Sequence, residues 1–367
     1  MRDAAARFAD QVVAPQAARL DLEEAFPHEV YGRMARDGFF GIAVADDHGG
    51  VGADILSYAI VMEELGRGYS AVADLCGLVE LVAGLLERLG RDDQKARYLN
   101  PLLCGELKCA FAITEADAGS DVARVKTRAQ RTKNGWRLTG SKLWINNGPV
   151  CDFAIVLART EGETGTKGLS TFIVERQWPG VSSGHKEHKM GQRASQVSAL
   201  FFDDVELPED ALLGEEGTGF RQMMQALDKG RVGIAALATG ICQAALNASI
   251  AHAKERVQFD QPIAEFQAVQ WMLADMAKDI HASRLMVHHA ARSLDRGERA
   301  TSEAAMAKCF ATDSAVRHTA NAVQIHGGSG YIRGFEVERL YRDAKITQIY
   351  EGTNQIQRML IARSLFA

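Results

Sequence analysis

The sequence predicts a mainly helical α+β protein in which one β-rich segment separates two helical segments. Prolines are scarce, at 7 in 367 residues, and each interior proline would cost a helix about 3 kcal/mol. Apolar residues recur with the 3.6-residue helical period in the first and last parts of the chain. Short runs of β-branched and aromatic residues lie between them. We therefore divide the chain into an N-terminal helical domain (1–107), a middle β domain (108–212) and a C-terminal helical domain (213–367).

The N-terminal domain is predicted to consist of helices joined by polar, glycine-rich turns. The stretch 78–89 carries Leu or Val on most turns, and DDHGGVGAD (46–54) separates two helical patterns. Around Cys109 the pattern changes to short strand-like runs. Asn134 and Gly135 separate two of these runs and predict a type I′ hairpin.

The C-terminal domain returns to the helical period after Gly219, with breaks expected near 261–262, at Gly297 and at the glycines of 327–330. Within it, 232–253 contains no Asp, Glu, Lys or Arg and is long enough to span a bilayer. Polar residues interrupt this stretch, and Ala and Gly supply much of its apolar content. We therefore expect the central helix of a soluble bundle and no integral membrane segment.

The composition argues against nucleic acid and metal ions as binding partners of the protein. The formal net charge is −5, from 42 basic and 47 acidic residues, so we expect no nucleic acid. The six cysteines lack zinc-type pairing, and His281, His288 and His289 have no ligand partner placed with them, so we expect no metal. Unpaired thiols and a charged N-terminus without an apolar core favour the cytoplasm, or the mitochondrial matrix in a eukaryote.

The first group of residues that could carry chemistry is FAITEADAGSD (111–121), at the edge of the β domain. The run 118–120 is small enough for backbone N–H groups to approach an anion or a ring carbonyl, and Thr114 and Ser120 offer hydroxyls. A tight loop after a strand explains the same residues equally well.

The second group is NAVQIHGGSGYIRG (321–334). Its glycines suggest phosphate binding, but no Lys-Ser/Thr follows them and a helical pattern precedes them, so neither a Walker loop nor a Rossmann turn fits. A glycine cap that ends a helix at Gly327 accounts for part of the pattern. The further glycines leave room for close approach of a ligand.

The third group is QIYEGTNQIQRMLIAR (348–363), in which Glu351 lies in an apolar, aromatic loop. Thr353 is a natural N-cap for the helix that follows. Desolvation raises the pKa of such a carboxyl toward that of a useful general base. The alternative is a solvated loop glutamate placed favourably at a helix N-terminus.

Together these segments resemble the acyl-CoA dehydrogenase family over essentially the whole chain. The strings TEADAGSD (114–121), WINNG (144–148), QIHGGSGY (324–331) and IYEGTNQIQR (349–358) match the family's motifs in the same order. The resemblance implies a middle β-barrel or sandwich, a C-terminal four-helix bundle and FAD as cofactor. It also implies α,β-dehydrogenation of an acyl-CoA thioester to the trans-2-enoyl-CoA, as in fatty acid β-oxidation. Glu351 would remove the α-proton while a hydride passes to flavin N5.

The resemblance assigns further residues position by position. Those assigned to FAD are Phe111, Ile113, Thr114, Gly119, Ser120, Trp144, Ile145, Asn146, Arg256, Gln267, Gln324, Ile325, Gly327, Gly328, Thr353 and Gln355. Those assigned to the thioester ligand are Ser120, Asp228, Arg231, Tyr350, Gly352 and Arg363. Residues 256, 267 and 324–328 would act across a subunit boundary, which implies a homo-oligomer, expected to be a homotetramer. From the residues alone, ordinary ion pairing is the alternative for the two arginines at 231 and 256.

Two features bear on the base and on the acyl group. A branch of the family carries its base in an Asp-x-x-Arg segment, but here that segment (DKGR, 228–231) has no acidic residue at its two middle positions. Glu351 therefore has no competitor there. Glu80 lies in the apolar run LCGLVELVAGLL (75–86). It faces either a buried basic partner or solvent, or it closes the acyl cavity and favours a short or polar-tailed acyl group.

Three functions follow from these motifs. The first is a dehydrogenase that passes electrons to an electron-transfer flavoprotein. The second is an oxidase or monooxygenase on the same fold that reacts with oxygen. The third is a redox-silent protein that binds acyl thioesters. The motifs leave open the acyl chain and its carrier, CoA or an acyl carrier protein.

Overall fold

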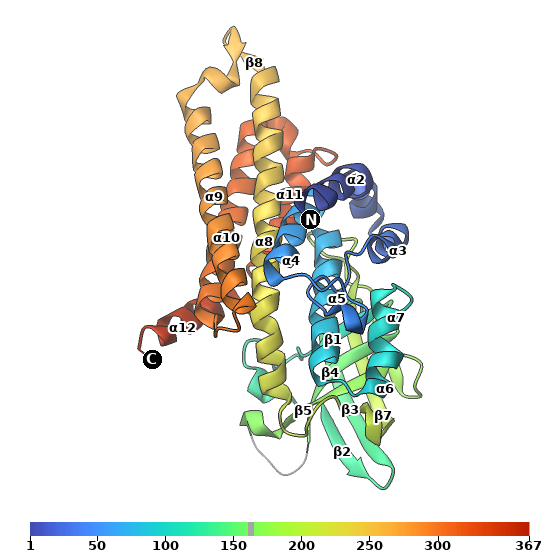
Figure 1. The fold of residues 1–367 in the computed structure, drawn as a ribbon. Coiled ribbons are helices and arrows are strands. Elements are labelled where there is room, and N and C mark those ends of the chain that lie inside the picture. Colours follow the sequence, from blue (N-terminus) through green and yellow to red (C-terminus); the bar gives the residue numbers. More distant parts are fainter. Residues whose placement is uncertain (161–164, 367) are drawn as a thin grey trace.

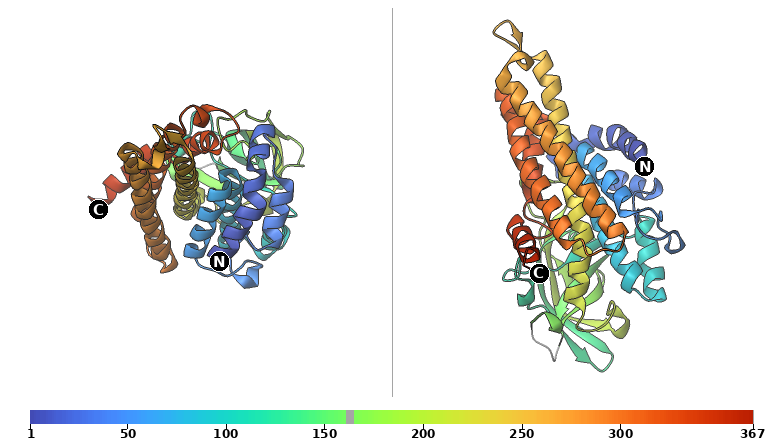
Figure 2. Two further views of the ribbon diagram at one scale, coloured as in Figure 1. Left: turned by 90° about the horizontal axis from the view of Figure 1, so that it is seen from above. Right: turned by 60° about the vertical axis from the view of Figure 1, so that its left-hand side comes forward.

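A computed structural model of the chain describes residues 1–160 and 165–366, in the order helical, β, helical (Figure 1). The predicted mainly helical α+β class is confirmed. The β domain lies at one end of the molecule, and the long helices of the C-terminal domain extend away from it. The N-terminal helices pack beside these long helices (Figure 2).

The N-terminal domain is built around two buried helices, α4 (Ile55–Gly68) and α5 (Ser70–Leu89). Asp54 begins α4 as its N-cap, because its carboxylate accepts a hydrogen bond from the Ser57 N–H at 2.7 Å. Helix α5 is apolar on almost every side and is buried along most of its length, as a core helix must be. The other helical segments are α1 (Arg2–Phe8), η1 (Ala9–Val13), α2 (Ala14–Glu23), α3 (His28–Arg36), α6 (Asp92–Gln94), η3 (Lys95–Leu99) and α7 (Asn100–Leu103).

The middle domain is a curled sheet of seven strands, which begins at Cys109 as predicted. The strand order is β1-β4-β2-β3-β7-β6, with β5 paired to β4. Most pairs are antiparallel, whereas β1 and β4 run parallel. The strands are β1 (Cys109–Ala112), β2 (Arg128–Thr132), β3 (Gly135–Asn146), β4 (Phe153–Arg159), β5 (Leu169–Glu175), β6 (Val181–Ser183) and β7 (Val197–Pro208).

The predicted β2–β3 hairpin is present, but its turn is not of type I′. Thr132 pairs with Gly135, so the two-residue connection is Lys133 and Asn134. Neither connecting residue has the positive φ that a type I′ turn requires. Gly135, at φ +142°, instead opens β3 where its backbone runs close to the end of β7; a Cβ there would lie 2.8 Å from the Glu209 backbone nitrogen.

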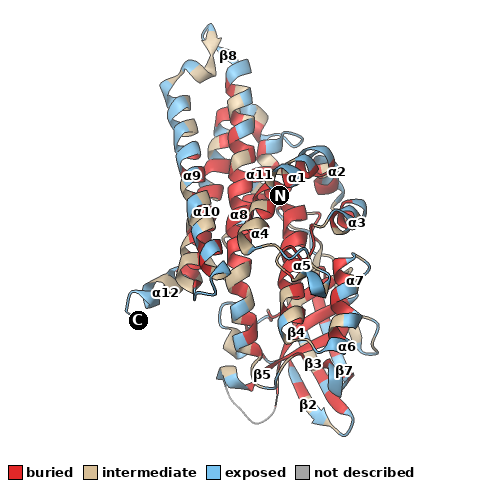
Figure 3. Cartoon of the chain, viewed as in Figure 1, coloured by how far each residue is buried: buried red, intermediate tan, exposed pale blue. Residues whose placement is uncertain are grey.

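The C-terminal domain is a helical bundle around α8 (Gly219–Glu255), which has 37 residues. The predicted helix breaks are confirmed, because α8, α9 and α10 all end close to them. The remaining elements are β8 (Val257–Gln258), β9 (Gln261–Pro262), α9 (Gln267–Asp295), α10 (Thr301–His326), η8 (Gly327–Tyr331), α11 (Glu336–Thr347) and α12 (Asn354–Ser364). By length and composition α8 could cross a membrane, but 72% of its apolar window is buried in the protein (Figure 3). It is the central helix that the sequence predicts.

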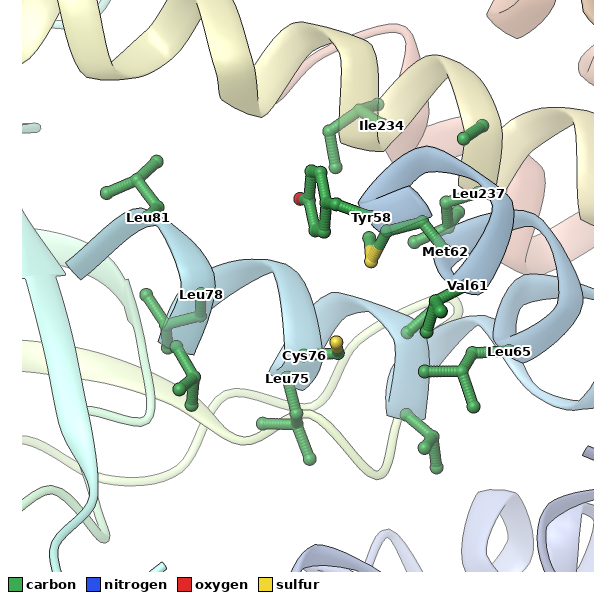
Figure 4. Packing of buried hydrophobic residues seen from close by; sticks show 14 of the residues in the cluster. Tyr58, Val61, Met62, Leu65, Leu75, Cys76, Leu78, Leu81, Ile234 and Leu237 are labelled. Carbon is green, nitrogen blue, oxygen red and sulfur yellow. The ribbon is translucent and has the colours of Figure 1, made fainter. Parts of the chain in front are cut away.

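Helices α4 and α8 cross at unusually short range. A Cβ on Gly66 would lie 2.7 Å from the Leu237 carbonyl oxygen, and one on Gly240 would lie 2.7 Å from the Arg67 backbone nitrogen. Glycine on both helices therefore permits the close crossing. Beside it, Tyr58 of α4 lies between α5 and α8 (Figure 4). The crossing joins the N-terminal domain to the helix that carries the 228–231 segment.

Candidate active site

The loop that carries Glu351 lies between α11 and α12 and has an unusual backbone. Glu351 and Gly352 both lie in the left-handed region, at φ +52° and +91°. Thr353 is the N-cap of α12, as predicted, and its hydroxyl accepts a hydrogen bond from the Ile356 N–H at 3.3 Å. Gln357 donates to the carbonyl oxygens of Glu351 and Gly352, at 3.3 and 2.8 Å. These bonds hold a non-glycine residue in a conformation that costs energy, which is common at functional sites.

A buried ammonium group also holds this loop, and the sequence analysis missed it. The Lys308 side chain, on α10, is fully buried. Its Nζ donates to the Gly352 carbonyl oxygen at 2.9 Å and to Asn354 Oδ1 at 3.0 Å. Burial lowers the pKa of Lys308 to about 8, against the opposing effect of Glu351. A lysine at an apolar helical position was the available signal, but its partner lies 44 residues away.

The Glu351 carboxyl group has the properties of a general base. Its Oε2 is buried and has no hydrogen-bond partner among the described residues. The pKa of Glu351 is raised to about 7, first by burial and then by the negative charge of Asp74, while Lys308 and Arg231 oppose the shift. An unpartnered carboxyl that titrates near neutral pH can accept or donate a proton.

Gly230 provides the space for this carboxyl group. Gly230 lies on α8, and a Cβ placed on it would lie 2.9 Å from Cδ of Glu351 and closer still to Oε2. The Asp-x-x-Arg segment that lacks an acidic residue thus packs its glycine directly on the base.

We expect Gly230→Ala to lower kcat with an acyl-CoA substrate by roughly 100-fold, because a displacement of about 1 Å at a reacting group can cost that much. The backbone of Gly230 is helical and accepts alanine, so the protein should fold. Gly32→Ala is the matched control, because a Cβ there meets only the end of the Arg36 side chain, at 3.6 Å. Steady-state kinetics of both variants test this, and a Gly230→Ala enzyme with the wild-type kcat would contradict it.

Arg231 and Asp228, both assigned to the thioester ligand, lie beside the base as an ion pair. Arg231 is 4% exposed, and its Nε has no partner among the described residues. Asp228 also accepts a hydrogen bond from the Thr301 hydroxyl at 2.7 Å. Tyr350, next to Glu351, accepts a hydrogen bond from Gln192 Nε2 at 3.3 Å. Ion pairing, the alternative for Arg231, is therefore present, and its buried Nε leaves a donor free for a ligand.

The β-domain residues assigned to FAD lie together in a group that we call the flavin edge, formed by the last residues of β3 around Trp144 and by the 111–120 segment. Trp144 is 65% exposed, at φ +55°, within a register shift of β3 against β7. The Leu143 N–H donates to the Thr114 carbonyl oxygen at 2.9 Å, which places the 111–120 segment alongside. Asn146 donates from Nδ2 to Asp74 at 2.6 Å. An exposed indole on a bulge is unusual for a folded surface and fits a planar ligand.

The other residues of the flavin edge differ in how far they are exposed and so in whether a ligand can reach them. Gly119 and Ser120 are exposed, and a Cβ on Gly119 would meet nothing within 4 Å. Phe111 and Ile113 are half-buried and buried, respectively. Ile145 is 2% exposed and belongs to the core of the β domain, so its side chain cannot cover a ring and only its backbone is available.

A buried ion pair that was not predicted supports the same edge. Lys142 is fully buried, and its Nζ donates to Glu115 Oε1 and to the Ile113 carbonyl oxygen, both at 2.8 Å. Glu115 also accepts from the backbone N–H groups of Lys126 and Thr127. The pair therefore fixes the loop that follows β1 against β3.

The second group assigned to FAD gathers at the far end of α8. Arg256 ends this helix, and the His252 ring stacks on His326 at the end of α10, with 4.3 Å between ring centroids. Arg256 and the glycines at 327 and 328 are exposed, and a Cβ on either glycine would meet nothing within 4 Å. This open, cationic corner suits a phosphate. It lies 26 residues along α8 from Gly230, or about 39 Å at 1.5 Å per residue.

The remaining assigned residues lie at the margins of these groups. Gln267 begins α9 and is exposed, Gln324 is exposed, and Ile325 is buried at the end of α10. Gln355 and Arg363 are exposed on α12, and among the described residues neither forms a hydrogen bond or an ion pair with Glu351. The structure thus brings together the base, Arg231 and Tyr350, and it separates them from the 256–328 corner.

Glu80 is buried and faces a basic partner, the half-buried Lys229. Its carboxylate accepts hydrogen bonds from the backbone N–H groups of Ile42 and Ala43, at 2.8 and 2.9 Å, and from Lys229 Nζ at 2.6 Å. These contacts account for the buried carboxylate and favour the basic partner over the hypothesis that Glu80 closes an acyl cavity. Glu80 instead ties three segments together next to Gly230.

Comparison with known proteins places the chain in a family. Models of the N-terminal, middle and C-terminal domains of acyl-CoA dehydrogenase match residues 1–106, 110–205 and 217–366. The 3-(aryl)acrylate reductase of Clostridium sporogenes is 43% identical over 367 residues, 100% of this chain and 97% of that protein. A subunit of the caffeyl-CoA reductase–Etf complex of Acetobacterium woodii is 44% identical over 349 residues, 94% of this chain and 92% of that protein. Butyryl-CoA dehydrogenase from Megasphaera elsdenii superposes with a TM-score of 0.97 at 40% identity, covering 100% of this chain and 97% of that one.

With the fold and the site, these matches define an oxidoreductase that acts on CH–CH bonds and uses FAD. The chain belongs to the acyl-CoA dehydrogenase family. The exposed residues around Trp144 and Gly119 fit a flavin ring, and the corner at Arg256 fits a phosphate group.

Proposed function

We propose that this protein catalyses the α,β-dehydrogenation of an acyl-CoA thioester to the trans-2-enoyl-CoA, with Glu351 as the general base. The observation that carries the proposal is the Glu351 carboxyl group, which is unpartnered at Oε2 and has a pKa raised to about 7. A carboxyl with the usual pKa would be a much weaker base toward the α-proton of a thioester. FAD, when bound, accepts the hydride that leaves the β-carbon.

The residues around Glu351 have complementary tasks in this reaction. The left-handed loop and Lys308 hold the carboxyl in position. The buried Nε of Arg231 can donate to the ligand, and burial around the base excludes water that would otherwise compete for the proton. The backbone N–H of Glu351 is a candidate donor to the thioester carbonyl oxygen.

We propose an electron-transfer flavoprotein as the redox partner. The relative from Acetobacterium woodii is by name a subunit of a complex with Etf, which supports this assignment over direct reaction with oxygen. The distance along α8 between the base and Arg256 supports a homo-oligomer, expected to be a homotetramer, in which Arg256 serves a neighbouring subunit's cofactor. The cytoplasm is the expected compartment.

The same site can also run in the reductive direction. Two relatives are reductases by name, and a carboxyl with a pKa near 7 is partly protonated at neutral pH. It can therefore return a proton to the α-carbon of an enoyl thioester. The electron partner, not the protein fold, sets the net direction.

An anaerobic titration tests the proposal. The purified flavoprotein is mixed with butyryl-CoA, longer acyl-CoAs and an arylpropionyl-CoA, and the flavin absorbance is followed. We expect bleaching by at least one thioester and recovery on addition of electron-transfer flavoprotein. Failure of every thioester to bleach the flavin would overturn the dehydrogenase assignment. Rapid recovery in air with peroxide release would replace the flavoprotein partner by oxygen.

A further inference from the structure

Asp74 is a second buried acidic residue close to the base, and neither the motifs nor the family assignment gives it a role. It lies in the apolar helix α5 and is 8% exposed. One oxygen, Oδ2, accepts hydrogen bonds from Asn146 Nδ2 at 2.6 Å and from the Ser195 hydroxyl at 2.9 Å. Ser195 Oγ also lies 2.8 Å from Asn146 Oδ1, so the three side chains form a closed triangle. A buried carboxylate is costly unless it is satisfied in this way.

This triangle connects the two halves of the site. Asn146 is two residues from Trp144, on the strand edge that fits the flavin. The segment 192–195 leads to the other half, because Gln192 Nε2 donates to the Tyr350 hydroxyl at 3.3 Å. Tyr350 immediately precedes Glu351. Asp74 therefore lies between the flavin edge and the loop of the base.

We propose that Asp74 is a positioning residue of the active site: it holds Asn146 at the flavin edge and places a negative charge beside the loop of the base. That charge favours the protonated form of Glu351. This inference rests on the proposed function. Its chemical consequence is that one carboxyl can serve both directions. In dehydrogenation Glu351 takes the α-proton. In reduction it would give a proton to the α-carbon of an enoyl thioester; the hydride for the β-carbon would come from FAD that reduced electron-transfer flavoprotein has reduced, so that the C=C bond becomes a C–C single bond.

The charges around Glu351 show why Asp74 matters. Lys308 and Arg231 face the base and favour its ionised form, and the neutral hydroxyls of Tyr58 and Tyr350 also lie within electrostatic range. Asp74 is the carboxylate that opposes the two cations. Without Asp74, burial would still raise the pKa of Glu351, but the two cations would be unopposed and the pKa would be lower than in the wild type.

Asp74 must itself be ionised to act. Burial raises its pKa to about 6, while Ser195, Lys189 and Asn146 stabilise the ionised form. Asp74 is therefore mostly charged at pH 7 and above, and its influence on the base fades as the pH falls through 6.

The test is the pH dependence of enoyl-CoA reduction by Asp74→Asn, measured as the reoxidation of the flavin when the anaerobically reduced, flavin-loaded enzyme is mixed with an enoyl-CoA. Reduction needs protonated Glu351, so the wild-type rate should fall as the pH rises through about 7. In Asp74→Asn that fall should begin at lower pH. We expect the rate to be about threefold to tenfold below wild type at pH 8 and close to wild type at pH 6, since one pKa unit corresponds to a tenfold change.

Matched variants separate charge from packing. Ser195→Ala removes one hydrogen bond but leaves the Asp74 carboxyl group in place, and Asp279→Asn removes another carboxylate of equal 8% exposure. Asp279→Asn should keep the wild-type midpoint, and Ser195→Ala should shift it less than Asp74→Asn does, because Ser195 only helps to keep Asp74 ionised. If Asp74→Asn does not fold, Asp74→Ser removes the same charge with a smaller side chain. A midpoint that is unchanged without the charge at position 74, or shifted equally by Ser195→Ala, would overturn the inference. Failure of the proposed function is distinct, because the wild-type flavin would then respond to no thioester in either direction.

Discussion

Glu351→Gln is expected to lower turnover with an acyl-CoA about 10³-fold or more while the flavin spectrum stays intact. Removal of a positioned general base typically costs 10²- to 10⁴-fold, and the Asp-x-x-Arg segment has no acidic residue at its two middle positions to replace it. Stopped-flow bleaching with the acyl-CoA that reduces the wild type measures the effect. The exposed Glu187→Gln is the control and should bleach at the wild-type rate. A Glu351→Gln enzyme that still turns over would move the base to another residue.

The same variant should be more stable than the wild type at neutral and alkaline pH. Because the folded state raises the pKa of Glu351 from 4.5 to about 7, it disfavours the ionised form, and this penalty develops as the pH rises from about 4.5 to 7. Glutamine resembles the protonated form and avoids the penalty, which is on the order of 2 to 3 kcal/mol. Denaturant unfolding at pH 5 and pH 8 checks the sign. The stability gain should be present at pH 8 and small at pH 5.

Lys308→Met should weaken the site in a different way. Without the ammonium group, the Gly352 carbonyl oxygen and Asn354 Oδ1 each lose a hydrogen-bond donor, so the loop that carries Glu351 is held less firmly. We expect kcat/KM to fall by about 10- to 100-fold. Because the positive charge of Lys308 opposes the raised pKa of Glu351, its removal should also move the acid limb of dehydrogenation to higher pH. This direction is opposite to the shift expected for Asp74→Asn.

Lys142→Met is the matched control for that prediction. Lys142 is equally buried, and burial also lowers its pKa to about 8, but its partner is Glu115. Removing it leaves a buried carboxylate unpaired and should destabilise the β domain. It should not move the titration of Glu351. An equal shift of the acid limb in both variants would show that Lys308 acts on the fold and not on the base.

The sequence predicted the features that depend on neighbours along the chain. The Thr353 cap and the helix end at Gly327 follow from the local order of residues, whereas the local order left open whether Glu351 is buried or solvated. Asp74 and Lys308 could not be found in this way, because their partners lie 72 and 44 residues away. The role of Glu80 could not be predicted for the same reason. Its apolar surroundings allowed two interpretations, and the contact with Lys229, 149 residues away, favours one of them.

The predicted turn type of the β2–β3 hairpin was wrong for a related reason. Asn-Gly is a strong local signal for a type I′ turn, but Gly135 is required by the approach of β7, which the local pattern does not contain. Contact with a distant strand therefore overrode the local preference.

Helix α8 constrains how this protein can evolve. This uninterrupted helix packs against β5 at its N-terminal end and contacts the base through Gly230. It ends at the cationic corner of Arg256. Inserting a single residue between Gly230 and Arg256 would rotate one end of α8 by about 100° relative to the other and lengthen the helix by about 1.5 Å. Single substitutions along α8 leave the relative positions of Gly230 and Arg256 unchanged, whereas an insertion or deletion between them would displace one from the other. We therefore expect natural homologues to vary in the composition of this helix and to conserve its length.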